Sequence, residues 1–348
     1  MKRTLMALLV FAAACSQGPT TTTTGPNPGP PEGVQPTGGA PVPSGWLYTQ
    51  DAKIYLSDGT KGTAWVGRGV NADDVFLCGY NSSLWMSSPE STLQTLGSHM
   101  VADWKAKFVR VSLGMNSFAT KASWTSGDPA AYKTPMTSMI NALGATPGVY
   151  VLVTLRSDDT MNDAGGDDAT FLPTAATDAT YQALVDTFAH SNFVLFGVSN
   201  EPGGNVLSND AIRAAMDHAV ATIRAEEDKL GVPHHVVSVQ GNDWTSDISF
   251  YASDPLPYDN VVYEVHGYPP PASSYTYANL PVIVGEYGNL ANASSFFADI
   301  EQKGIPSLAW DFDPYSDCAP DLLTINQSAS NLVPTAWGTT VKTYLLAH

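Results

Sequence analysis

Short apolar stretches alternate with longer amphipathic segments along most of this chain. The stretches are too short for membrane helices and rich in Val, Ile and Phe, so we interpret them as strands of a parallel sheet buried on both faces. The segments 209–230 and 291–303 repeat apolar residues at helical spacing and stop at Gly231 and Gly304, as helices do. The predicted strands are 64–70, 108–113, 149–155, 193–198, 235–239, 261–265, 282–285 and 307–310.

Eight strands that alternate with helices predict an α/β protein with a closed (β/α)8 TIM barrel. An open doubly wound sheet is the alternative, but no Gly-x-Gly-x-x-Gly follows the first strand. In a barrel, polar residues that follow the strands meet at one rim. These residues are Arg110, Arg156, Asp158, Asp159, Asn200, Glu201, Gln240, Asn242, Trp244, His266, Tyr268, Glu286 and Trp310.

The first part of the chain differs from the rest in composition. Residues 1–15 have basic residues, a short apolar segment and small residues before Cys15, which is the layout of a lipoprotein export signal. Residues 16–45 are mostly Thr, Pro, Gly and Ser and predict a disordered linker, so 46–348 forms the folded domain. We expect an exported protein, lipidated on Cys15 at the outer membrane or cell surface. Ordinary cleavage after Ala14 and secretion is the alternative.

The charge of the chain narrows the class of ligand. Its 348 residues include 16 Lys and Arg against 33 Asp and Glu, a formal net charge of -17. This argues against nucleic acid as a partner, and against any membrane contact beyond a lipid on Cys15. An acidic surface suits a neutral ligand, although it is also a common route to solubility. We expect a monomer.

Two glutamates stand at the carboxyl ends of predicted strands. Glu201 follows 193–198 in an Asn-Glu-Pro motif, and Glu286 follows 282–285. A single glutamate of this kind could satisfy a helix N-terminus. Two of them, with Arg110 and Tyr268 supplied from other strands, favour the paired-carboxylate chemistry that cleaves glycosidic bonds.

At these positions the chain resembles glycoside hydrolase family 5, the cellulase family among the clan A retaining barrel enzymes. The resemblance covers residues 63–345, essentially the whole predicted domain. One Asn-Glu-Pro motif would be weak support, whereas six motifs in the same order on the expected strands are strong support. They are Gly69-Val70-Asn71, Arg110, Asn200-Glu201-Pro202, His266-Gly267-Tyr268, Glu286 and Trp310.

The resemblance implies that Glu201 is the catalytic acid/base and Glu286 the nucleophile. Arg110 and Tyr268 would hold and polarise Glu286. We expect the negative charge of Glu286 to raise the pKa of Glu201 and keep it protonated as a proton donor. Carboxyl groups about 5 Å apart would give retention of configuration.

The resemblance also implies substrate-binding and supporting roles around this pair. Asn200 would bind the sugar 2-hydroxyl, His266 would support the site, and Trp310 would form the floor of the cleavage subsite. Trp244, in the loop after the fifth strand, would stack on a sugar ring. Arg156 stands where the family commonly has a histidine, so the cleavage subsite differs in detail.

Two further features lie in the predicted loops. Cys78 and Cys318 follow the first and last strands, which are neighbours in a closed barrel, so we predict a disulfide between them; two separate thiols are the alternative. Trp85 and Trp124 are additional candidates for sugar stacking. The acidic segment 158–168 could bind calcium, but its spacing is not that of an EF-hand, and a solvated or substrate-lining loop is favoured.

The sequence therefore predicts a retaining endo-glycosidase that needs no metal or cofactor. The expected substrate is a neutral β-1,4-linked polysaccharide, cellulose-type β-glucan first, with β-mannan or another β-glucan as alternatives. Transglycosylation could use the same glutamates. A surface protein that binds carbohydrate without cleaving it is an alternative of another class, and the presence of Glu201, Glu286 and Arg110 argues against it.

Overall fold

The computed structural model describes residues 42–72, 89–114, 118, 130–156, 172–173, 175, 177–202, 207–314, 320–325 and 328–348. All of them belong to one compact unit of the chain, residues 33–348. Some predicted features lie outside the described residues and stay predictions. They are the export signal with Cys15, the linker up to residue 41, Trp85, Trp124, the segment 158–168, and the Cys78–Cys318 disulfide.

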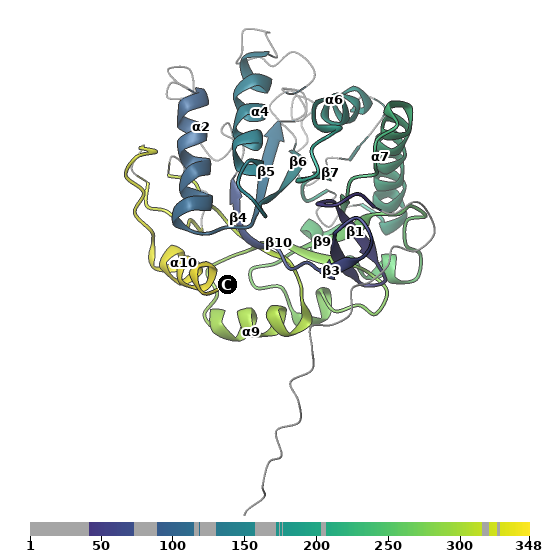
Figure 1. Ribbon diagram of the computed structural model, residues 1–348. Helices are drawn as coiled ribbons and strands as arrows, with labels where there is room; N and C mark the ends of the chain where they lie inside the picture. Colours follow the sequence, from purple (N-terminus) through teal and green to yellow (C-terminus); the bar gives the residue numbers. More distant parts are fainter. Residues whose placement is uncertain are drawn as a thin grey trace, which may run out of the picture. The chain divides into compact units, whose positions relative to one another are not determined.

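Eight parallel strands close into a barrel (Figure 1). Around the barrel the order is β10-β11-β4-β5-β6-β7-β8-β9, so every strand lies beside its neighbour in sequence. Each predicted strand overlaps one barrel strand, and the TIM-barrel prediction is confirmed. The bounds are β4 (Arg68–Ala72), β5 (Phe108–Gly114), β6 (Tyr150–Arg156), β7 (Val194–Gly197), β8 (Val237–Gln240), β9 (Val261–His266), β10 (Val282–Tyr287) and β11 (Ser307–Ala309).

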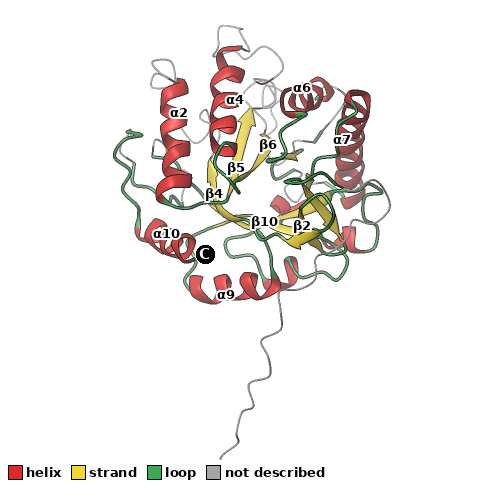
Figure 2. Ribbon diagram, viewed as in Figure 1, coloured by secondary structure: helices red, strands yellow, loops and turns green. Residues whose placement is uncertain are grey.

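Helices surround the strands (Figure 2). The helix α7 begins after Ser208, whose side chain accepts a hydrogen bond from the backbone of Ala211, and ends at Gly231 in the left-handed conformation. Within the described ranges, no helix combines the length and apolar character needed to cross a bilayer. The helices are α2 (Pro89–Ser98), α4 (Ala130–Gly144), α6 (Asp178–Phe188), α7 (Asn209–Leu230), α8 (Asn242–Thr245), α9 (Ala293–Lys303) and α10 (Ala336–Ala347), with short turns η1 (His99–Asp103), η4 (Ser249–Ala252) and η5 (Ala272–Ser274).

A small antiparallel sheet precedes the barrel and was not predicted. It consists of β1 (Leu47–Gln50), β2 (Lys53–Ser57) and β3 (Gly62–Ala64). Leu47 and Ile54 of this sheet pack against residues at the amino ends of barrel strands, including Phe108. The sheet therefore closes the amino end of the barrel, opposite the rim where chemistry is expected.

The barrel interior changes from apolar to polar along the strands. Side chains two residues apart share one face of a strand, so each strand carries an inward series. These series run from Phe108 to Arg110 on β5, from Leu152 through Thr154 to Arg156 on β6, and from Val262 through Glu264 to His266 on β9. The apolar amino end packs as a core, and buried polar groups accumulate toward the carboxyl rim.

Candidate active site

Glu201 lies at the carboxyl rim of the barrel, in the segment that follows β7 (Val194–Gly197). Its φ of 45° is in the left-handed region, which residues other than glycine rarely adopt. The Glu201 backbone N–H donates to Gln240 Oε1 at 2.5 Å, and Gln240 Oε1 also accepts from the Thr245 hydroxyl at 3.0 Å. This network holds a strained backbone, as is common at functional sites. The Glu201 side chain remains 21% exposed.

Glu286, on β10, is more deeply buried than Glu201, with 5% of its side chain exposed. Arg110 Nη1 donates to its Oε1 at 2.7 Å, and the Tyr268 hydroxyl donates to its Oε2 at 2.7 Å. Burial and the charge of Glu286 raise the pKa of Tyr268 well above its ordinary value, so the hydroxyl stays a donor. Both oxygens of Glu286 are thereby fixed in orientation.

Arg110 is fully buried beneath both glutamates. Since arginine only donates, the carbonyl oxygen of Asn200 must face it, which turns the Asn200 NH2 group toward other acceptors. A guanidinium held on all its edges cannot rotate, so it fixes several side chains of the site at once. Its partners are Asn200 Oδ1 at 2.6 Å, Asn71 Oδ1 at 3.0 Å, Thr154 Oγ1 at 3.1 Å and, in an ion pair, Glu264 Oε1 at 3.1 Å.

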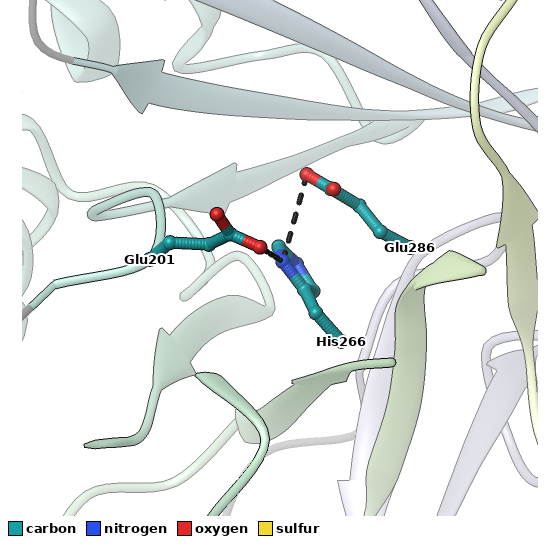
Figure 3. A group of neighbouring side chains, drawn as sticks. All are labelled: Glu201, His266 and Glu286. Carbon is teal, nitrogen blue, oxygen red and sulfur yellow. Dashed lines mark hydrogen bonds and ion pairs between the residues drawn. The ribbon is translucent and has the colours of Figure 1, made fainter. Parts of the chain in front are cut away.

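His266, at the end of β9, lies between the two glutamates (Figure 3). Its Nδ1 is 2.9 Å from Glu201 Oε1 and 3.5 Å from Glu286 Oε1, and its Nε2 is 2.8 Å from Glu264 Oε1. Burial favours the neutral ring, but the three carboxylates outweigh it and raise the pKa of His266 to about 9. The ring is therefore an imidazolium that donates from both nitrogens at neutral pH.

The protonation expected for Glu201 is not what this environment produces. Burial acts to raise its pKa, but the hydrogen bond and charge of His266, followed by the charges of Arg156 and Arg110, lower it overall. The expectation that Glu286 keeps Glu201 protonated was wrong because it left out these cations. Glu201 and His266 share one hydrogen bond, so the proton available near neutral pH belongs to the pair.

The separation of the two glutamates limits their chemistry. One oxygen from each of Glu201 and Glu286, and one ring nitrogen of His266, lie within 4.8 Å of one another. Inverting enzymes need about 6.5–9.5 Å between their carboxyl groups to admit a water. The three atoms are close enough to hold a metal ion, but Arg110 Nη1 lies 2.7 Å from Glu286 Oε1, so its positive charge opposes a cation at this position.

The two tryptophans predicted to bind sugar differ in exposure. Trp244 is 45% exposed, in the segment after β8 where Asp243, Trp244 and Thr245 all have positive φ, between 52° and 62°. Trp310 is only 5% exposed, and the guanidinium of Arg156 lies 5.7 Å from its ring centre. Trp244 is therefore open to a ligand, whereas Trp310 is largely covered.

Most predicted site residues meet in one hydrogen-bonded cluster. Arg156 and Trp310 contact each other beside it, and Trp244 is connected through the hydrogen bond of Thr245 to Gln240. The cluster consists of Arg110, Asn200, Glu201, His266, Tyr268 and Glu286.

Four further side chains contact this cluster, and none of them was assigned to catalysis or substrate binding from the sequence. Asn71 and Thr154 bind Arg110, Gln240 binds the backbone of Glu201, and Glu264 binds both Arg110 and His266. Strand periodicity indicated a structural group for Glu264, in the layer below His266, since it stands two residues earlier on the same face. A charged residue facing the inside of a barrel needs a partner there.

Comparison with known proteins agrees with this geometry. Endoglucanase N of Pectobacterium atrosepticum is 25% identical over 181 residues, which is 51% of this chain and 37% of that protein, so the chain spans about a third of this relative's length. The structure of β-glucanase SdGluc5_26A from Saccharophagus degradans, in complex with cellotetraose, superposes with a TM-score of 0.65 at 16% identity, over 88% of this chain and 95% of that one. The catalytic domain of a mannanase from Streptomyces sp. SirexAA-E gives a TM-score of 0.60 at 20% identity, over 86% and 90%.

These structural similarities establish the fold, and a match to a family model establishes the family. Residues 70–316, from the first barrel strand to beyond the last, match the model of the family described as Cellulase (glycosyl hydrolase family 5). That match contains every residue of the hydrogen-bonded cluster. The chain therefore belongs to glycosyl hydrolase family 5 and is a glycoside hydrolase built on a (β/α)8 barrel.

Proposed function

We propose that the protein is a retaining endo-glycosidase acting on a neutral β-1,4-linked polysaccharide, with Glu286 as nucleophile and Glu201 as acid/base. The observation that carries this proposal is a pair of carboxylates in unlike environments, with one oxygen of Glu201 within 4.8 Å of one oxygen of Glu286. Glu286 is buried and held at both oxygens, as an oriented nucleophile requires. Glu201 is partly exposed and paired with a proton-bearing histidine, as a proton donor requires.

In the first step, an oxygen of Glu286 attacks the anomeric carbon of the sugar. The bond from that carbon to the leaving oxygen breaks, and Glu201 delivers a proton to this oxygen. That proton comes from the Glu201–His266 pair, so the pair has one proton fewer once the leaving sugar has departed. Arg110 and Tyr268 keep Glu286 in its attacking position.

In the second step, a water molecule attacks the same carbon from the opposite face. Glu201 takes the proton of this water, which restores the proton of the pair, and the bond to Glu286 breaks to regenerate its carboxylate. The configuration is inverted twice and is thus retained. No proton is gained or lost over the cycle.

Tyr268→Phe removes the hydroxyl that donates to Glu286 Oε2 while keeping the ring. A hydrogen bond to a charged group contributes about 1.5–3 kcal/mol, so we expect kcat to fall by about 10–100-fold. Steady-state kinetics on cellotetraose, with thermal unfolding as a control for folding, measure the effect. Wild-type kcat in a correctly folded variant would remove Tyr268 from the mechanism.

The proposed order of substrates rests on similarity to known proteins and on the net charge of the chain. The curated relative is named an endoglucanase, and one structural neighbour was solved with cellotetraose, whereas another is a mannanase. These names support a β-1,4-glucan first and a β-1,4-mannan second. The net charge of -17 disfavours a strongly anionic polymer.

Activity on a substrate panel tests this order. The panel contains hydroxyethyl cellulose, mixed-linkage β-glucan, β-1,3-glucan, mannan and xylan, with both reducing ends and viscosity followed. We expect the fastest reaction on the β-1,4-linked glucans and a viscosity loss that runs ahead of reducing-end release, which is the signature of endo cleavage. A preference for mannan would replace the substrate but keep the mechanism. Binding without turnover on every member would favour a non-catalytic carbohydrate-binding protein.

A further inference from the structure

Glu264 is a fully buried carboxylate that the two chemical steps do not use. It lies on β9, two residues before His266, and its side chain has no exposed surface. Its Oε1 is 3.1 Å from Arg110 Nε and 2.8 Å from His266 Nε2, and its Oε2 accepts from the Ser238 hydroxyl at 2.7 Å. These three partners lie inside the barrel, below the catalytic pair.

The neighbouring strand leaves room for this carboxylate. A Cβ added to Gly285, on β10, would lie 2.0 Å from Glu264 Oε1 and 2.5 Å from its Cδ. Gly285 does not have a positive φ, so space and not backbone conformation requires a glycine here. The residue directly before Glu286 thus lacks a side chain because the Glu264 carboxylate occupies that position.

One oxygen of Glu264 therefore touches both groups that hold the catalytic carboxylates. Arg110 binds Glu286, and His266 binds Glu201. Resting on the function proposed above, we propose that Glu264 is a positioning residue that links Glu286 to Glu201 through Arg110 and His266, and that keeps on His266 the proton that Glu201 delivers.

The charges around His266 support this role. The titratable or charged groups facing it are Glu201 from the segment after β7, Glu264 on its own strand, Glu286 with Tyr268 behind it, and Arg110 from β5, which approaches both Glu264 and Glu286. If Glu264 became neutral, two buried cations would face only the two catalytic carboxylates. The imidazolium would then lose a direct ion-pair partner and would release its proton at lower pH.

A purely structural role is the competing explanation, since any buried arginine needs a counter-charge. The chain offers a matched control for it at the amino end of the barrel. Glu227 is equally buried and likewise binds an arginine and a histidine, with Arg224 Nη1 at 2.6 Å and His235 Nδ1 at 2.8 Å. Glu227→Gln thus removes a similar charge from a similar environment that lies far from the catalytic rim.

The test compares kcat/KM against pH for wild type, Glu264→Gln and Glu227→Gln. Cellotetraose, or mannotetraose if the panel favours mannan, has a poor leaving group and needs the proton of the pair. For Glu264→Gln we expect the alkaline limb of the kcat/KM profile to move to lower pH by about 1–3 pH units. We also expect kcat at the optimum pH to fall by about 10–100-fold. On 2,4-dinitrophenyl β-cellobioside, whose leaving group needs no proton, we expect no such movement of the limb.

For Glu227→Gln we expect a lower unfolding temperature. We expect the alkaline limb of its kcat/KM profile to lie at the same pH as in wild type. An unmoved limb in folded Glu264→Gln, or an equal movement in both variants, would overturn the inference. If Glu264→Gln does not fold, nitrogen NMR of the histidine rings measures the protonation state of His266 in the wild-type protein. The signals of His266 are assigned as those missing from the spectrum of His266→Gln. We expect an imidazolium up to about pH 9; a neutral ring near neutral pH would contradict it.

A failure of the proposed role of Glu264 can be distinguished from a failure of the proposed function. Retaining hydrolysis by wild type together with an unmoved limb rejects the role of Glu264 alone. Absence of hydrolysis in wild type rejects the function itself, and the limb comparison is then replaced by the ring measurement, which needs no turnover.

Discussion

Replacing Glu286 by alanine is expected to lower kcat on β-glucan by about 10⁵-fold or more, because no other described carboxylate can form the glycosyl intermediate from the same face. Arg110 and Tyr268 would remain in place around an empty position. Reducing-end assays on hydroxyethyl cellulose and cellotetraose measure the loss. Turnover close to wild type would reject Glu286 as the nucleophile.

Two controls keep this result specific to chemistry. Calorimetric binding of cellotetraose and thermal unfolding establish that the variant still folds and still binds. Azide is small enough to enter the space left by Glu286, so with an activated aryl β-cellobioside it should attack the α face and yield the α-glycosyl azide. A β-azide product would assign the nucleophile to a different group.

Glu201→Ala should give a contrasting kinetic pattern, because it removes the proton donor and leaves the nucleophile intact. On cellotetraose we expect kcat/KM to fall by about 10²–10⁴-fold, the usual contribution of general acid catalysis. With 2,4-dinitrophenyl β-cellobioside the first step needs no acid, so kcat/KM should stay near the wild-type value. Release of the intermediate then becomes slow, and kcat and KM fall together.

Added azide should restore kcat in Glu201→Ala and give the β-glycosyl azide, since it attacks the intermediate on Glu286 from the side of Glu201. An equal loss on both substrates would contradict the acid/base assignment. Glu227→Gln serves again as the control, because it changes a buried glutamate outside the site.

Much of the fold could be predicted because its signals are local. Continuous apolar stretches predicted all eight barrel strands, and α7 was predicted over its full length because apolar residues repeat at helical spacing up to the terminal Gly231. The small sheet at the amino end was missed because its strands are short and partly polar. The first barrel strand begins at Arg68, four residues later than predicted, because β3 pairs with β2 instead.

Most residues of the site could also be predicted from the sequence, because residues that follow parallel strands meet at one rim. Its electrostatics could not be predicted, because they depend on distances between side chains from different strands. The pKa of Glu201 reflects His266, Arg156 and Arg110 together. Likewise the guanidinium of Arg156 on β6 lies 5.7 Å from the ring centre of Trp310 after β11, and no periodicity in the sequence specifies this approach.

The stereochemistry of the first product tests the central claim most directly. Proton NMR of wild type acting on cellotetraose can follow the anomeric signals before the released sugars equilibrate. Carboxylate oxygens within 4.8 Å of each other lead to double displacement, so we expect the β-anomer to appear first and the α-anomer only later by mutarotation. Initial formation of the α-anomer would contradict it.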